Sequence, residues 1–430
     1  MKRRKFITTS GLAFGGISAA PLYSATFQDR PKRIALLGSG WWGMNILREA
    51  IAYGNCRTVA LCDVDQTQLT KALKEVNSLS GESPKTYDDY RDMIQSEKPD
   101  IVIVATPDHW HALGAIEAIE NGCHVYLEKP IGHTMDEGKA ILNAARDRER
   151  VVQVGTHRRV SPHNISAMDF LRQGNVGDIS SVKCFVNYGM NPGEPVPDED
   201  VPEGLDWDMW CGPAPYRNYN RSIHPRGFRQ WLDYANGQIG DWGIHWFDQV
   251  LWWTDEKYPK TIYSHGDRHI RKDHSDAPDT QYAIFDFESF TMTWEHKLCA
   301  PNANEAGNVG CYFYGTKGTL HLGWIDGWTF YPSNKNDSVI HVDSQLNEPD
   351  QQNIKELWHD FMESIRLQRK PACDIEHGYH ATNISLLGMI SYKLNRSIRW
   401  DGDNHTILDD SEATSLMRRT YRGEWQYPKI

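Results

Sequence analysis

The chain has 430 residues, a formal net charge of −11 and 40% hydrophobic residues. This length exceeds what one ordinary hydrophobic core organises, so we expect two domains. The acidic balance argues against binding nucleic acid through its phosphates, and no apolar run is long enough to span a bilayer. We therefore expect a globular protein with no nucleic-acid partner and no stable membrane insertion.

The N-terminus has the pattern of an export signal. The pair Arg3-Arg4 precedes a mild apolar stretch from Ile7 to Ala20, which ends in small residues. This pattern is typical of a signal peptide, and paired arginines direct proteins to the twin-arginine route. We expect residues 1–30 to be a twin-arginine signal peptide with its linker, and the mature protein to be periplasmic. The alternative is a basic, disordered N-terminus.

Residues 31–155 show the β-α-β alternation of a Rossmann domain. Short runs rich in Val, Ile and Leu are typical of strands buried on both faces of a parallel sheet, and the segments between them suit crossover helices. The predicted strands are Arg33–Leu37, Thr58–Cys62, Ile101–Ala105, His124–Leu127 and Val151–Val154. The pattern predicts an α/β fold with a doubly wound parallel sheet.

Residues 156–430 follow a different pattern. Strand-like runs succeed one another here without regular alternation with helices. Helices are predicted over residues 161–173, 241–253, 353–367 and 379–394. The pattern favours a C-terminal α+β domain with a large open, mostly antiparallel sheet and helices on one face.

A glycine fingerprint follows the first predicted strand and precedes a helix. Gly38, Gly40 and Gly43 have the spacing of a dinucleotide-binding loop, with Trp41 and Trp42 at its variable positions. The glycines permit a tight turn and close approach of the backbone to a pyrophosphate. The plainer alternative is a glycine turn that only packs a helix against a strand.

Polar residues also follow three other predicted strands. Asp63 ends the second strand, where a carboxylate accepts hydrogen bonds from both ribose hydroxyls and repels a 2′-phosphate. We therefore expect NAD rather than NADP. Thr106 and His111, then Glu128 and Lys129, follow the next two strands, where ligands of such sheets bind. A salt bridge between Lys129 and Glu128 at the sheet rim is the alternative for that pair.

These motifs resemble those of the Gfo/Idh/MocA family of NAD(P)-dependent sugar and cyclitol oxidoreductases. The fingerprint, Thr106-Pro107-Asp108 and Glu128-Lys129-Pro130 match that family in order and spacing, and the resemblance covers residues 32–401 approximately. It implies a Rossmann domain followed by a domain whose open sheet covers the nicotinamide and often forms oligomers. We therefore expect a homo-oligomer. An exported member of the family with tightly held cofactor has a twin arginine too.

The predicted catalytic residues lie in the C-terminal half. Asp241, His245 and Asp248 are spaced i, i+4 and i+7, which places them on one face of a helix. A histidine between carboxylates suits removal of a proton from an alcohol as hydride leaves its carbon. The resemblance implies that Asp241 and His245 act with Lys129 at the substrate carbon. The alternative is a helix whose His and Asp pair with neighbours in a domain interface.

Substrate contacts are expected from three further side chains. His157 and Arg158 follow the last Rossmann strand and face the expected nicotinamide, although salt bridging would explain them equally well. We also expect Asp248 to bind substrate. No histidine or cysteine cluster has the spacing of a metal site, so no metal is expected.

Together these features predict an exported, NAD-dependent oxidoreductase that oxidises a secondary hydroxyl of a sugar, glycoside or cyclitol. In this hypothesis His245 is the general base, Lys129 polarises the hydroxyl, Asp241 orients His245, and NAD stays tightly bound. The resemblance also implies an alternative, a glycosidase that oxidises, eliminates and reduces on bound NAD. The Tyr-Pro-Thr-His pattern of those glycosidases is absent at Gly243-Ile244-His245. A non-catalytic sugar-binding protein is disfavoured because Lys129, Asp241 and His245 are all present.

Overall fold

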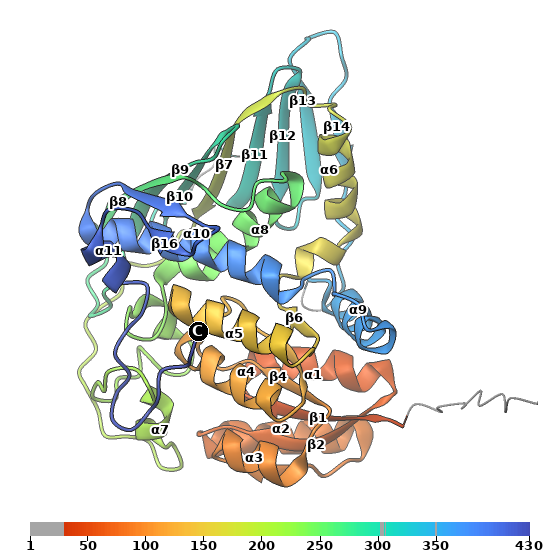
Figure 1. Ribbon diagram of the computed structural model, residues 1–430, viewed down its shortest axis with the longest axis vertical. Helices are drawn as coiled ribbons and strands as arrows, with labels where there is room; N and C mark the ends of the chain where they lie inside the picture. The colour runs from red at the N-terminus through yellow and green to blue at the C-terminus, as the bar shows by residue number, and fades with distance from the viewer. Residues whose placement is uncertain (1–29, 302–304, 306, 349–350) are drawn as a thin grey trace, which may run out of the picture.

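The computed structural model describes residues 30–430 except 302–304, 306 and 349–350. Of the predicted signal peptide and linker, residues 1–30, all but Arg30 lie outside the described residues. The described chain forms two sheets with their helices, one above the other in Figure 1. Within these ranges, no helix combines the length and apolar character needed to cross a membrane.

The first domain is the predicted Rossmann domain. Its six strands are all parallel, in the order β3-β2-β1-β4-β5-β6. The strands are β1 (Lys32–Leu37), β2 (Cys56–Cys62), β3 (Lys85–Tyr87), β4 (Ile101–Val104), β5 (His124–Leu127) and β6 (Val152–Val154). The helices are α1 (Trp41–Tyr53), α2 (Gln66–Ser80), α3 (Tyr90–Glu97), α4 (His111–Glu120) and α5 (Met135–Asp147).

The strand order determines where a ligand binds in this domain. Strand β1 pairs with β2 on one side and β4 on the other, so the sheet grows in both directions from β1. Such a reversal leaves a crevice beyond the carboxyl ends of the two central strands. The glycine fingerprint follows β1, Asp63 follows β2, and Thr106 follows β4.

The second domain contains the predicted large sheet. Its ten strands lie in the order β14-β13-β12-β11-β7-β10-β9-β8-β15-β16, and all neighbours are antiparallel except β7 and β10. The strands are β7 (Ile179–Asn187), β8 (Thr261–Asp267), β9 (Thr280–Asp286), β10 (Thr291–Lys297), β11 (Val309–Gly315), β12 (Gly318–Gly323), β13 (Trp328–Pro332), β14 (Ile340–Val342), β15 (Ile398–Asp401) and β16 (Thr406–Ile407).

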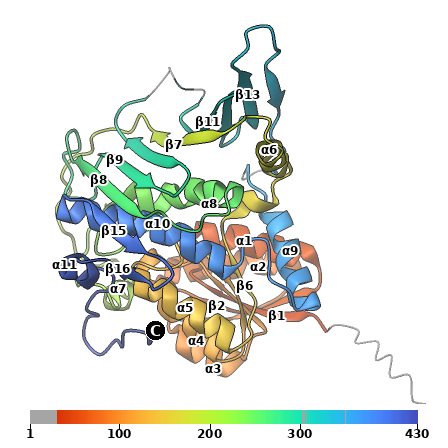
Figure 2. The same ribbon diagram turned by 45° about the horizontal axis from the view of Figure 1, so that its top comes forward.

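Helices α8 (Ile244–Trp253) and α10 (Ile375–Leu394) lie on the face of the large sheet that points toward the Rossmann domain (Figure 2). Helix α10 packs against α8 and β8 on one side and α5 of the first domain on the other, so it ties the two domains together. The helices are α6 (Pro162–Arg172), α7 (Trp207–Cys211), α8 (Ile244–Trp253), α9 (Ile354–Leu367), α10 (Ile375–Leu394) and α11 (Ser411–Ser415).

Segments that follow residue 155 in the chain also pack on the first domain, so the predicted boundary does not separate the two domains in space. Helix α9 lies beside α1 and packs on the Rossmann sheet, where the Trp358 ring stacks on Tyr126 with centroids 6.0 Å apart. The C-terminal tail also returns to the first domain, because the Tyr421 hydroxyl donates to Glu137 at 2.8 Å. Both segments belong by sequence to the predicted second domain, 156–430, and by packing to the first.

The predicted helix over 241–253 differs from the observed one at its start. Residues Ile239–Gly243 form a π-helical turn, and regular α-helix begins only at Ile244. A π-turn contains more residues than an α-turn, so side chains before and after it no longer share one face. This change affects which side chains contact the Asp241 carboxylate.

Candidate active site

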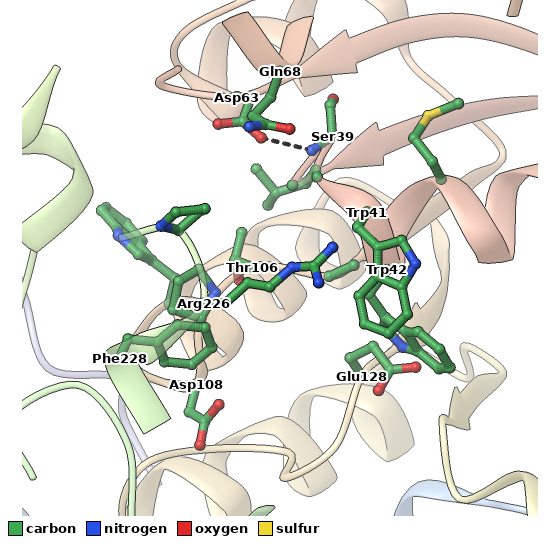
Figure 3. A pocket seen from close by; sticks show the side chains of 18 of the residues that line it. Ser39, Trp41, Trp42, Asp63, Gln68, Thr106, Asp108, Glu128, Arg226 and Phe228 are labelled. Carbon is green, nitrogen blue, oxygen red and sulfur yellow. Dashed lines mark hydrogen bonds between the residues drawn. The ribbon is translucent and has the colours of Figure 1, made fainter. Parts of the chain in front are cut away.

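A cavity of about 760 Å³ lies between the two domains at the carboxyl ends of the Rossmann strands. Residues from both halves of the chain line it, and Figure 3 shows several of them converging on the space. The predicted site residues in its wall are Gly38, Gly40, Trp41, Trp42, Asp63, Thr106, His111, Glu128, Lys129, His157, Asp241 and His245. Three predicted residues do not line it: Gly43, Arg158 and Asp248.

The glycine loop has the shape that a dinucleotide needs. Gly38 has φ +90°, and a Cβ there would lie 2.6 Å from the Ala105 backbone. A Cβ on Gly43 would lie 2.1 Å from the Gly38 oxygen, so Gly43 lets α1 approach the loop. A Cβ on Gly40 would meet nothing within 4 Å, because this residue faces the cavity. The loop therefore leaves backbone exposed to a ligand at the start of α1.

Asp63 lies where a cofactor ribose is expected. Its two carboxylate oxygens accept the backbone N–H groups of Ser39 at 2.8 Å and Asp65 at 3.0 Å, and Figure 3 shows the first bond. Burial raises the pKa of Asp63 to about 6. The side chain is thus oriented toward the cavity by the glycine loop itself, as a ribose-binding carboxylate requires.

Buried polar groups shape the middle of the cavity wall. The His111 ring lies 2.6 Å from the Pro130 carbonyl and 2.9 Å from the Thr106 carbonyl, so it joins the loops after β4 and β5. Burial lowers the pKa of His111 to about 4. Glu128 accepts the Lys129 backbone N–H at 3.1 Å, and burial raises the pKa of Glu128. These groups fix the backbone from which Lys129 projects.

Lys129 and Asp241 form an ion pair between the domains. The Lys129 ammonium donates to the Asp241 carboxylate at 2.7 Å and to the Asp241 carbonyl at 2.8 Å. Arg229 lies on the other side of this carboxylate, at 3.2 Å. Burial opposes ionisation of Asp241, but its two cationic partners lower its pKa to about 2. Asp241 is therefore a carboxylate that orients the ammonium.

His245 lines the same end of the cavity without contacting Asp241 through a hydrogen bond. Its Nδ1 is buried and has no hydrogen-bond partner. Burial first, and the nearby cations Lys129 and Arg158 second, lower the pKa of His245 far below its usual range. The sequence-based expectation that Asp241 orients His245 is wrong, because the π-turn directs Asp241 to Lys129 and Arg229. Three aromatic rings surround the His245 ring. The distance between ring centroids is 4.9 Å for Trp324, 5.7 Å for His157 and 5.8 Å for Trp242.

The three predicted substrate contacts have different surroundings. His157 lines the cavity beside His245, and burial lowers its pKa strongly. Arg158 is buried, stacks on Trp324 at 3.8 Å and lies outside the cavity wall. Asp248 is fully buried and accepts from Arg159 at 2.8 Å, so its predicted role in substrate binding is wrong. That carboxylate instead neutralises the buried Arg159.

Sequence reasoning assigned no individual role to several further residues of the cavity wall. Arg229, Arg226 and His224 reach the wall from the loop before the π-turn, and Trp324 reaches it from the large sheet. Asp108 lies there too, and burial raises its pKa to about 7. The sequence shows only that aromatic and basic residues are frequent in this loop; it contains no spacing that would assign them to the cofactor.

Family patterns match both halves of the chain. The NAD-binding Rossmann fold of an oxidoreductase family matches residues 32–156, and the C-terminal alpha/beta domain of the same family matches residues 185–427. The chain belongs to the Gfo/Idh/MocA oxidoreductase family. Its first domain is an NAD-binding Rossmann domain, as predicted.

Curated relatives resemble only part of the chain. A glycosyl hydrolase family 109 protein of Stenotrophomonas maltophilia is 28% identical over 206 residues, which are 45% of each chain. The rhizopine catabolism protein MocA of Rhizobium meliloti is 27% identical over 225 residues, 52% of this chain and 58% of MocA. The chain thus spans about half the length of the curated relatives it matches.

Solved structures share the fold over most of the chain. Aldose-aldose oxidoreductase from Caulobacter crescentus has a TM-score of 0.65 at 19% identity, and the match covers 86% of this chain and 100% of that one. Scyllo-inositol dehydrogenase from Lactobacillus casei, with bound NAD(H) and scyllo-inositol, has a TM-score of 0.61 at 20% identity, covering 86% and 98%. At these identities the likeness concerns the fold.

Proposed function

We propose that this protein is an NAD-dependent dehydrogenase that oxidises a secondary hydroxyl of a sugar, glycoside or cyclitol and keeps NAD tightly bound. The main support for the proposal is that Lys129, Asp241 and His245 line one cavity and that Lys129 and Asp241 form an ion pair there. The glycine loop and Asp63 line the same cavity, so a dinucleotide bound to them would share it with these three residues.

Each of these three residues has a role in removing a proton from an alcohol. We assign acceptance of the hydroxyl proton to the imidazole of His245, because it lines the cavity and its Nδ1 has no hydrogen-bond partner. The Lys129 ammonium donates a hydrogen bond to the substrate oxygen and stabilises negative charge that develops there. Asp241 holds that ammonium in place. NAD, when bound, supplies the hydride acceptor.

A panel of sugars, glycosides and cyclitols tests the proposal. Purified, NAD-loaded protein is mixed with each compound, and formation of NADH is followed by absorbance in single turnover. We expect reduction with a compound that has a secondary hydroxyl, and loss of this reduction in the Lys129→Ala variant. Absence of reduction across the panel, with NAD shown to be bound, would contradict the proposal.

A redox-neutral glycosidase is the second candidate. It is favoured by the partial likeness to glycosyl hydrolase family 109 proteins. In that case oxidation of the sugar is followed by loss of the aglycone and return of the hydride, so no NADH accumulates. A nitrophenyl glycoside assay without added cofactor separates the candidates, because release of nitrophenol occurs only with a hydrolase.

Two further properties belong to this proposal. Export by the twin-arginine route is supported by Arg3-Arg4 and the apolar stretch after them. A homo-oligomer is supported by exposed apolar side chains on the large sheet: Tyr263, Tyr282, Ile284, Tyr314 and Tyr331. Light scattering on the wild type and an Ile284→Lys variant tests the second property. A wild-type monomer would contradict it.

A further inference from the structure

A segment of the second domain lines the cavity beside the cofactor-binding loops. This segment, residues 204–228, is called the strap below. It begins beside the loop after β2, where Gln66 N–H donates to the Gly204 carbonyl at 2.9 Å and Asp206 N–H donates to the Val64 carbonyl at 3.0 Å. Near its other end, His224 Nε2 lies 3.1 Å from the Asp65 carboxylate. Both ends of the strap are therefore attached to the same part of the Rossmann domain, residues 64–66 after β2.

Arg226 projects from the strap into the cavity. Its guanidinium lies 4.6 Å from the centroid of the Trp41 ring, and Figure 3 shows the side chain extending toward Trp41 and Trp42. Within the part of the chain that the structure describes, no carboxylate pairs with this guanidinium. The nearby start of α1 also has no side-chain cap, because its N-cap is Gly40. A cation without a counter-charge thus faces free backbone N–H groups across the cavity.

The chemistry of this arrangement matches a diphosphate. An exposed helix start binds anions through its N–H groups, and a guanidinium binds phosphate oxygens in a bidentate manner. The Rossmann loop supplies only the first of these two features. The second comes from the strap, more than 180 residues later in the chain.

We propose that Arg226 is a ligand of the NAD diphosphate and that the strap slows cofactor release. The Arg226 guanidinium, stacked on Trp41, would hold the diphosphate together with the N–H groups at the start of α1. NAD then has to break contacts with both domains before it leaves. This inference rests on NAD binding alone, so its test needs no sugar and fails independently of the proposed reaction.

The first experiment measures NADH release. Protein preloaded with NADH is mixed with excess NAD, and loss of bound NADH fluorescence is followed in a stopped-flow instrument. We expect Arg226→Ala to release NADH roughly 10- to 100-fold faster, as loss of a charged hydrogen bond implies, and Arg226→Lys to lie in between. Arg221→Ala is the matched control, because Arg221 is exposed on the same strap, pairs with Glu199 and does not line the cavity. Equal release rates in the wild type and Arg226→Ala would overturn the proposal.

The second experiment tests whether Arg226 binds the charged diphosphate or supports the shape of the adenosine pocket. Calorimetry compares binding of adenosine diphosphate and of adenosine to the cofactor-free wild type and the Arg226→Ala variant. We expect the variant to lose roughly tenfold or more in affinity for adenosine diphosphate while its affinity for adenosine changes less than twofold. Equal losses for both compounds would show that Arg226 supports the adenosine pocket and does not bind the diphosphate.

Discussion

The Lys129 ammonium lies 2.7 Å from the Asp241 carboxylate and joins the two domains at the end of the cavity that His245 lines. Lys129 follows a Rossmann strand, and Asp241 belongs to the π-turn before α8. The position of the ammonium therefore depends on how the domains dock. In the proposed reaction, the ammonium that binds the hydroxyl is in place only when both domains are folded together.

Asp241→Asn should lower turnover and leave NAD affinity unchanged. The amide no longer holds the ammonium by charge, and misplacement of a reacting group by about 1 Å costs roughly 100-fold in rate. Steady-state kinetics and NAD titration measure the two quantities. Asp169→Asn, on the exposed face of α6, is the control. Turnover near the parent value would remove the ion pair from the mechanism.

His245→Ala should lose most hydride transfer while NAD still binds. Removing a general base typically costs about 10²–10⁴ in rate. The measurement is single-turnover reduction of NAD in a folded, NAD-loaded variant, with exposed His265→Ala as the control. A rate within a few fold of the parent would direct attention to His157, which lies beside His245 in the cavity.

Asp63→Ala should weaken NAD binding and relax the exclusion of NADP. A charged hydrogen bond contributes about 1.5–3 kcal/mol, and the carboxylate that repels a 2′-phosphate is gone. Titration with both cofactors measures the effect, and Asp92→Ala, on the exposed face of α3, is the control. If the variant still binds NAD in preference to NADP, another group distinguishes the ribose of NAD from that of NADP.

His109→Gln should change how stability depends on pH. Burial lowers the pKa of His109 to about 3, so the folded protein keeps this ring neutral. The unfolded chain protonates it below about 6.5, and the wild type loses up to about 1.4 kcal/mol per pH unit from this residue as pH falls from about 6.5 toward 3. Asp63 and Asp108, whose pKa values burial raises, act in the opposite direction, so the comparison with the variant is essential.

The measurement for His109 is the unfolding midpoint between pH 7 and pH 5. We expect the midpoint of His109→Gln to fall less steeply with acidification than that of the wild type. The exposed His265→Gln variant should follow the wild-type slope. Parallel curves for wild type and His109→Gln would mean that His109 does not contribute to the pH dependence of folding.

Replacing Arg3-Arg4 by Lys-Lys should leave the protein inside the cell, because the twin arginine is the proposed export address. Cell fractionation of the wild type and the variant measures this directly. Replacement of Lys2 and Lys5 by Arg, which preserves the pair, is the control. Unchanged periplasmic yield of the variant would indicate a different route.

Local patterns in the sequence determined the Rossmann domain and its cofactor loop. Buried strands have continuous apolar sequences, and Gly38 and Gly43 stand where a Cβ would collide with neighbouring backbone. Asp63 was predicted for the same reason, since it ends a strand whose neighbour carries the loop. These features depend on residues close in sequence or on the fixed geometry of a parallel sheet.

Only the tertiary structure decided the pairings at the catalytic end. Asp241 and His245 have the spacing of helical neighbours, but a π-turn, which sequence periodicity does not reveal, separates their directions. Lys129 meets Asp241 across 112 positions of the chain, and Arg226 reaches Trp41 from the other domain. Such contacts depend on how two packed domains fit, because burial of a charge is favourable only beside the partner that docking brings to it.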